Sequence, residues 1–121
     1  KVRVTRIVSA ADCGHLVSPD NCVNQIEGGI IQSLSWSLKE EVKFDDTAVL
    51  SSDWASYPIL TFTETPPIEV ELINRPGERY LGMAEASQQQ VAPALAAAIF
   101  EACGARLRQL PFTPERVKAA I

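Results

Sequence analysis

Residues 23–39 read VNQIEGGIIQSLSWSLK. The apolar side chains of this stretch recur every four residues, a spacing that predicts a long helix with one buried face. These positions are Ile26, Ile30, Leu34 and Leu38. Gly28 and Gly29 interrupt the helix, although each glycine costs a helix about 1 kcal/mol relative to alanine. We therefore expect a close approach to the backbone there, either by a neighbouring helix or strand or by a ligand.

Shorter elements are predicted on both sides of this helix. They are a strand at Val2–Ala10, a hairpin of Glu41–Phe44 with Ala48–Ser51, a strand at Ile68–Ile73, a helix at Gln88–Ala102 ended by Gly104, and a last helix that begins at Thr113-Pro114. Pro93 is expected in the first turn of its helix, where proline is tolerated. The order of elements predicts an α+β fold, with a mostly antiparallel sheet packed against two main helices.

Length and charge narrow the class of protein. The 121 residues, 46% of them hydrophobic, suit one small domain that covers residues 1–121. The net charge of −4 argues against nucleic acid as a partner, and no apolar run reaches the roughly 18 residues of a membrane span. Because the chain does not begin with methionine, we expect an excised domain or a processed product.

The cysteines and the single histidine argue against a metal site. Cys13, Cys22 and Cys103 are widely spaced and form no C-x-x-C pair, which disfavours zinc or iron–sulfur binding. His15 alone excludes a multi-histidine site. We expect the cysteines to be small buried side chains, and no metal-ligating residue is predicted in the chain.

Gly82-Met83-Ala84-Glu85 places a carboxylate just before the helix predicted at Gln88–Ala102. The positive end of a helix favours an ionised carboxylate, and such a group at a pocket can take a proton from bound water. Glu85 is thus either an ordinary helix-start acid or a general base. Gln32 is, by itself, an ordinary solvated residue of the long helix.

Several short motifs follow one another along the chain. They are Asp12-Cys13-Gly14, Gln25 with Glu27-Gly28-Gly29, Gln32, Glu40-Glu41, Tyr57-Pro58 and Gly82-x-x-Glu85. In this order they resemble the C-terminal part of the molybdopterin-binding subunit of molybdenum hydroxylases, the xanthine dehydrogenase and aldehyde oxidase family. The runs Gly29–Trp36 and Leu110–Val117 look most similar to the isoquinoline 1-oxidoreductase β-subunit and its relatives. The resemblance covers nearly the whole chain but only a small terminal part of such a subunit.

The resemblance implies an activity, cofactors and partners. Members of this family hydroxylate a carbon of an aromatic N-heterocycle or an aldehyde, and water supplies the oxygen. The implied cofactor is molybdenum on a pterin, as molybdopterin or its cytosine dinucleotide form, while iron–sulfur clusters lie on a partner subunit. The implied partners are the remainder of the molybdopterin subunit, an iron–sulfur subunit and a small heterocycle or aldehyde substrate. The bacterial cytoplasm and periplasm both stay open as compartments.

The same resemblance assigns residues to the site. Glu85 matches the family's catalytic general base, and Gln32 matches the glutamine that hydrogen-bonds the molybdenum-pterin group. Gly28 and Gly29 match positions where the cofactor or a neighbouring segment comes close to the backbone. The family's usual turn is Gly-x-Gly-Glu, and Ala84 replaces its second glycine. A positive φ at that position would strain alanine.

Two functional hypotheses stand side by side. In the first, the chain is the C-terminal cofactor-binding part of a molybdenum hydroxylase, inactive as an isolated fragment because other segments supply most of the cofactor contacts. In the second, it is a non-catalytic interaction or structural module derived from that fold. Both predict apolar surface that is exposed here and covered by other parts of the protein.

Overall fold

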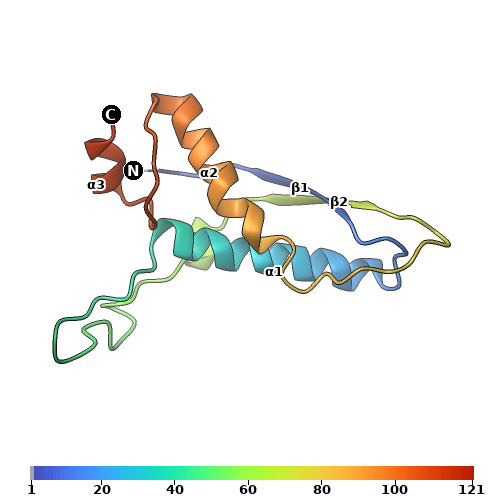
Figure 1. Cartoon of the computed structure of the whole chain (residues 1–121), viewed down its shortest axis with the longest axis horizontal. Coiled ribbons are helices and arrows are strands. Elements are labelled where there is room, and N and C mark those ends of the chain that lie inside the picture. The colour runs from blue at the N-terminus through green and yellow to red at the C-terminus, as the bar shows by residue number, and fades with distance from the viewer. Residues whose placement is uncertain (1) are drawn as a thin grey trace.

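The computed structural model describes residues 2–121, which form three α-helices, two β-strands and one short 3-10 helix. In chain order the elements are β1 (Ile7–Asp12), α1 (Pro19–Leu38), the 3-10 helix η1 (Phe62–Glu64), β2 (Ile68–Ile73), α2 (Gln88–Cys103) and α3 (Pro114–Ala119). The two strands lie side by side, α1 runs along one face of them, and α2 crosses α1 (Figure 1). Within residues 2–121, no helix combines the length and the hydropathy of a membrane-spanning segment.

The two strands are parallel, so the prediction of a mostly antiparallel sheet is wrong. Ile7 pairs with Ile68, and the register continues in step to the end of both strands. The physical reason is α1, whose 20 residues span about 30 Å and carry the chain back to the end where β1 began. The hairpin that was expected to supply antiparallel strands reduces to one isolated bridge between Phe44 and Val49, outside the sheet.

β1 begins later than predicted, at Ile7 rather than at Val2. In the parallel register, the two residues before Ile7 would face Pro66 and Pro67, which have no backbone N–H to donate. The ladder therefore starts where Ile7 donates its N–H to the carbonyl of Pro67 over 3.0 Å. β2 has the predicted bounds, and its two glutamates, Glu69 and Glu71, are exposed.

α1 forms the centre of the hydrophobic core, and its predicted four-residue periodicity is confirmed. Ile26, Ile30 and Leu34 are at most 2% exposed, and the half-buried side chains of both strands pack against them. The buried side chains that α2 contributes are Val91, Leu95 and Ile99. The helix begins at Pro19, earlier than the predicted Val23. Because its apolar face is covered on two sides, α1 can hold other elements in fixed positions.

α2 begins at Gln88 as predicted, and it ends at Cys103, just before Gly104. Pro93 lies inside the helix and not in its first turn, so that expectation is wrong. Since proline has no N–H, the carbonyl of Gln89 lacks its usual helical donor. The last helix, α3, has the predicted start.

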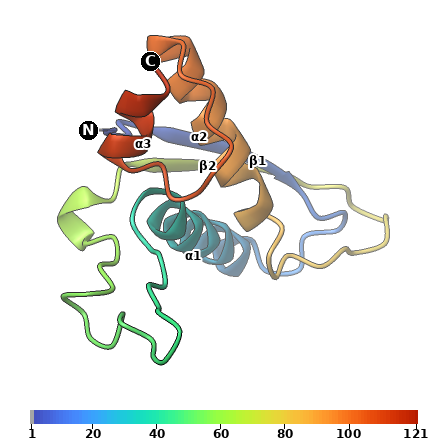
Figure 2. The ribbon, with the colours of Figure 1, turned by 60° about the vertical axis from the view of Figure 1, so that its left-hand side comes forward.

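The chain between α1 and η1 leaves the body of the molecule as a long loop (Figure 2). Large apolar side chains are exposed along it, with Trp54 78% exposed and Phe62, at its end, 95% exposed. Polar contacts hold its base, where the hydroxyl of Tyr57 donates to Oε2 of Glu40 over 2.8 Å. The apolar exposure agrees with the surface expected from the sequence.

Candidate functional site

The residues singled out from the sequence converge where α1 meets the chain that enters α2. One face of α1 presents Gln25, Gly29 and Gln32, whose spacings of four and three residues place them in a row. Residues 81–88 pass across this row before α2 begins, and contacts at several points join the two. We refer to this contact region as the helix crossing.

The turn after β1 anchors the beginning of the crossing segment. Leu81 donates its N–H to the carbonyl of Cys13 over 2.8 Å. Gly14 has a φ of +73°, and a Cβ there would lie 2.1 Å from the backbone carbonyl oxygen of Arg79. The turn therefore requires glycine. Oδ1 of Asp12 accepts the Gly14 N–H over 3.0 Å. This N–H, and after it the guanidinium of Arg75, lower the pKa of Asp12 below its usual range.

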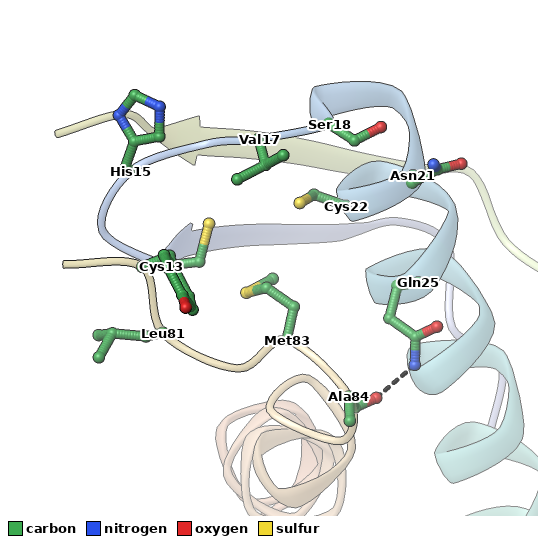
Figure 3. A pocket seen from close by; sticks show the side chains of 11 residues that line it. Cys13, His15, Val17, Ser18, Asn21, Cys22, Gln25, Leu81, Met83 and Ala84 are labelled. Carbon is green, nitrogen blue, oxygen red and sulfur yellow. Dashed lines mark hydrogen bonds between the residues drawn. The ribbon is translucent and has the colours of Figure 1, made fainter. Parts of the chain in front are cut away.

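Ala84 occupies its turn without backbone strain. No non-glycine residue within residues 2–121 has a positive φ, and Ala84 is no exception. Gly82 has no positive φ either, and a Cβ at Gly82 would meet nothing within 4 Å. The carbonyl of Ala84 accepts a hydrogen bond from the side-chain amide of Gln25 on α1 (Figure 3). The alanine that replaces a family glycine is therefore compatible with the turn.

The two glycines of α1 have different surroundings. A Cβ at Gly29 would lie 2.3 Å from Oγ of Ser87 and 3.2 Å from Cγ of Gln88, where the chain enters α2. The close approach expected from the sequence is thus made by a neighbouring element. A Cβ at Gly28 would meet nothing within 4 Å, and Gly28 is exposed. Of the two, Gly28 is the glycine whose backbone a group outside the described chain can reach.

Gln32 contacts the first residue of α2. Its Oε1 accepts a hydrogen bond from Nε2 of Gln88 over 2.8 Å, and Oγ of Ser33 donates to the Gln88 carbonyl over 3.0 Å. With its oxygen engaged, the exposed Gln32 still has amide N–H groups to offer to an acceptor. Gln25 and Gln88 are not among the predicted site residues. The seven-residue spacing of Gln25 and Gln32 already indicates a shared face, whereas the contact with Gln88 arises only on folding.

Glu85 is exposed and lies two residues before Ser87, the N-cap of α2. Its backbone carbonyl accepts the Gln88 N–H over 3.1 Å, which ties Glu85 to the start of the helix. The same short turn contains the two residues that contact Gly29 and Gln32 on α1. The folded chain therefore links the backbone turn of Glu85 to Gln32 through Gln88, although the two residues are far apart in the sequence.

A cavity of about 390 Å³ adjoins the crossing (Figure 3). It lies between the turn after β1, the N-terminal turns of α1 and residues 80–84. Side chains on its wall include Cys13, His15, Cys22, Gln25 and Met83. Within residues 2–121, no group of three or more His, Cys, Asp or Glu side chains is arranged to hold a metal ion.

Comparison with a protein-family model gives a match over more than half of the chain. The model, described as a molybdopterin cofactor-binding domain, matches residues 1–66. The matched part contains Gly28, Gly29 and Gln32, and Glu85 lies beyond it.

Individual relatives extend the similarity to the whole chain. A nicotinate dehydrogenase subunit of Pseudomonas putida is 46% identical over 100% of the chain, and the β-subunit of isoquinoline 1-oxidoreductase of Brevundimonas diminuta is 36% identical over 92% of it. The crystal structure of quinoline 2-oxidoreductase from Pseudomonas putida 86 matches 98% of the chain, with a TM-score of 0.87 and 29% identity. The chain spans only 10%, 14% and 16% of these three proteins, respectively. These matches confirm the resemblance drawn from the motifs.

Proposed function

The chain belongs to the molybdopterin cofactor-binding domain family, and from this premise we propose that it is the C-terminal part of a molybdenum hydroxylase subunit. The complete enzyme oxidatively hydroxylates an aromatic N-heterocycle or an aldehyde and takes the oxygen from water. Relatives named for nicotinate and isoquinoline support the heterocycle as substrate class. In this proposal Glu85 is the general base.

One observation carries the proposal: the crossing of α1 with residues 81–88. Gln32 and the turn of Glu85 meet there through Gln88, which is bonded to the side chain of Gln32 and to the backbone of Glu85. An amide can bind an oxygen-bearing group and a carboxylate can take up a proton, and the proposal gives these two roles to Gln32 and Glu85.

The residues at the crossing fit a molybdenum-pterin group. Gln32 offers amide N–H groups to an oxo or sulfur acceptor without adding charge. The open space over Gly28 lets a bulky group come close to the backbone of α1, whereas Gly29 is already covered by α2. When bound, the group supplies the Lewis-acid and redox chemistry of the reaction.

The Glu85 carboxylate accepts a proton from the water that provides the new hydroxyl group. An ionised carboxylate offers only acceptor atoms, which suits this task. Its backbone is held by the start of α2, while the side chain is exposed to whatever binds at the crossing. Other segments of the subunit then have to orient the carboxylate and complete the pocket. The isolated 121-residue chain is accordingly expected to be inactive.

The rest of the assembly follows from the length of the relatives. Because the chain spans 10–16% of the relatives described above, most of the contacts to the cofactor come from the remainder of the molybdopterin subunit. Iron–sulfur clusters on a partner subunit carry the electrons away. The exposed apolar side chains are the surface that these parts cover.

The test of the proposal is Glu85→Gln in the full-length subunit, purified with its partner. Because the amide cannot take up the proton, kcat should fall by roughly 10²-fold or more, while molybdenum and pterin content stay unchanged. Glu101→Gln, at an exposed glutamate near the other end of α2, is the matched control and should retain full activity. Normal turnover of the Glu85 variant would exclude the role as base. Absence of molybdenum from the wild-type protein would favour a non-catalytic module instead.

A further inference from the structure

Two thiols face each other on the wall of the cavity beside the crossing. Cys13 belongs to the turn after β1 and is 3% exposed, whereas Cys22 lies in the first turn of α1 and is half-buried. Figure 3 shows their sulfur atoms pointing toward one another, with the side chain of Met83 below them. The proposed hydroxylation uses neither thiol.

The surroundings make the two thiols chemically unequal. Burial raises the pKa of the Cys13 thiol, and the charge and hydrogen bonding of the neighbouring Cys22 raise it further. Cys22 is more exposed on the open cavity, so a small dissolved oxidant reaches Cys22 first. Cys103, the third cysteine, is exposed at the end of α2, where its Sγ contacts the carbonyl of Ile99.

We propose that Cys13 and Cys22 form a reversible disulfide on the wall of this cavity, with a low-molecular-weight disulfide such as oxidised glutathione as the oxidant. The Cys22 thiolate attacks one sulfur of the oxidant, which forms a mixed disulfide and releases the first glutathione thiolate. Cys13 then gives its proton to solvent and attacks the Cys22 sulfur, which forms the internal bond and releases the second. The two cysteines lose two electrons together, and the oxidant is reduced to two thiols.

The bond would join the two elements that hold the chain entering α2. The carbonyl of Cys13 accepts the N–H of Leu81, and Gln25, one helical turn beyond Cys22, donates to Ala84. A disulfide would tie these two anchors together at their shared cavity. The inference stands on the cavity and its thiols, and it does not depend on the proposed hydroxylase activity.

The sequence allows the redox state of Cys13 and Cys22 to be measured in one peptide that contains no other cysteine. Tryptic cleavage after Arg6 and Lys39 releases the peptide Ile7–Lys39, which contains Cys13 and Cys22 and no other cysteine. The full-length native protein is equilibrated with oxidised and reduced glutathione, quenched in acid, alkylated, digested and analysed by mass spectrometry. We expect this peptide to be free of alkyl groups and lighter by two hydrogen atoms than its reduced form. Dithiothreitol should restore two alkylated cysteines.

Four comparisons decide the outcome. Cys22→Ser should remove the internal disulfide and leave Cys13 free, and Cys13→Ser should leave Cys22 as the mixed disulfide with glutathione. Cys103→Ser, the matched control, should leave the peptide unchanged from the wild type. The native protein should hold the disulfide about tenfold or more over the same protein in urea at equal glutathione ratio, because the fold brings the thiols together. Two alkylated thiols in the native wild type, a persistent mixed disulfide, or equal oxidation in urea would each overturn the proposal.

Discussion

Beside the helix crossing, apolar side chains of α1 and α2 pack together away from water, whereas the loop from Glu40 to Thr61 is mostly exposed to solvent. Ile30 and Leu34 of α1 are at most 2% exposed, and Gly29 lets the chain entering α2 come close. The loop instead is held by polar side chains. Glu41, near its start, forms an ion pair with Arg116 of α3 at 2.6 Å.

The two regions differ in how firmly they can hold a side chain in a fixed position. Apolar burial and close contact hold Gln32 and the Glu85 turn in one place, because any shift would open voids in the core. Ion pairs at the surface contribute less to stability than buried apolar contacts do, because water competes for the charged groups. The exposed apolar side chains of the loop, such as Trp54, suit contact with another part of the protein better than they suit a fixed site.

The largest change in the free energy of unfolding is expected when a buried side chain of the core is truncated. Leu34→Ala should lower the free energy of unfolding by about 2–5 kcal/mol, because it removes a fully buried side chain and leaves a cavity. Phe44→Ala, in the loop, should change it by no more than about 0.5 kcal/mol, since Phe44 is 73% exposed. Thermal unfolding of the full-length protein and its two variants measures both. Similar losses for the two would mean that the loop is packed as tightly as the core.

A smaller effect should separate the two adjacent glycines. Gly29→Leu should destabilise the protein by about 1–3 kcal/mol, because the new side chain has to displace Ser87 and Gln88. Gly28→Ala, its matched control, should stabilise the helix by about 0.5–1 kcal/mol, since nothing lies within 4 Å of the new Cβ. Denaturant titration of the full-length protein and its two variants measures the sign of both stability changes. A stabilising leucine at position 29 would contradict the close crossing of α1 and the start of α2.

The smallest effect concerns the polar links at the base of the loop. Lys39 and Thr61 lower the pKa of Glu64 from 4.5 to about 2, with the Lys39 ammonium the largest cause. A lowered folded-state pKa favours the ionised form, so the contribution to stability is present above pH 4.5 and is lost as the pH falls toward 2.

Glu64→Gln should therefore cost less than about 1 kcal/mol at neutral pH, because solvent screens the pair, and the difference from the wild type should vanish near pH 2. Unfolding midpoints measured between pH 2 and 7 test this dependence. Asp46→Asn, at an exposed loop acid, serves as the control. If the stability lost in Glu64→Gln grew as the pH fell, the pH dependence would have the opposite sign and would contradict the ion-pair explanation.

Much of the local structure could be predicted from the sequence, but the direction of the strands could not. The periodicity of α1 and the alternation of Ile68–Ile73 depend on neighbours close in the chain, and both predictions are confirmed. The prediction of an antiparallel sheet was wrong, because strand direction depends on where the intervening helix and loop return the chain. The expectation that Pro93 lies in the first turn was also wrong, because α2 already begins at Gln88, five residues before the proline.

The site divides in the same way. The row of Gln25, Gly29 and Gln32 follows from helical spacing alone. The bond from Gln88 to Gln32 joins residues 56 positions apart, and no local pattern indicates it. Whether Ala84 could replace a glycine was likewise a question of backbone conformation, which only the folded turn answers.

The helices, the strand at Ile68–Ile73, the family and the residue types available at the candidate site could all be predicted from the sequence. Each of these depends on the order of neighbouring residues or on motifs written along the chain. The tertiary structure alone decided that the strands are parallel, that Gly29 meets the start of α2, and that Cys13 faces Cys22. These are contacts between segments distant in the chain, and the burial of α1 between the sheet and α2 selects them.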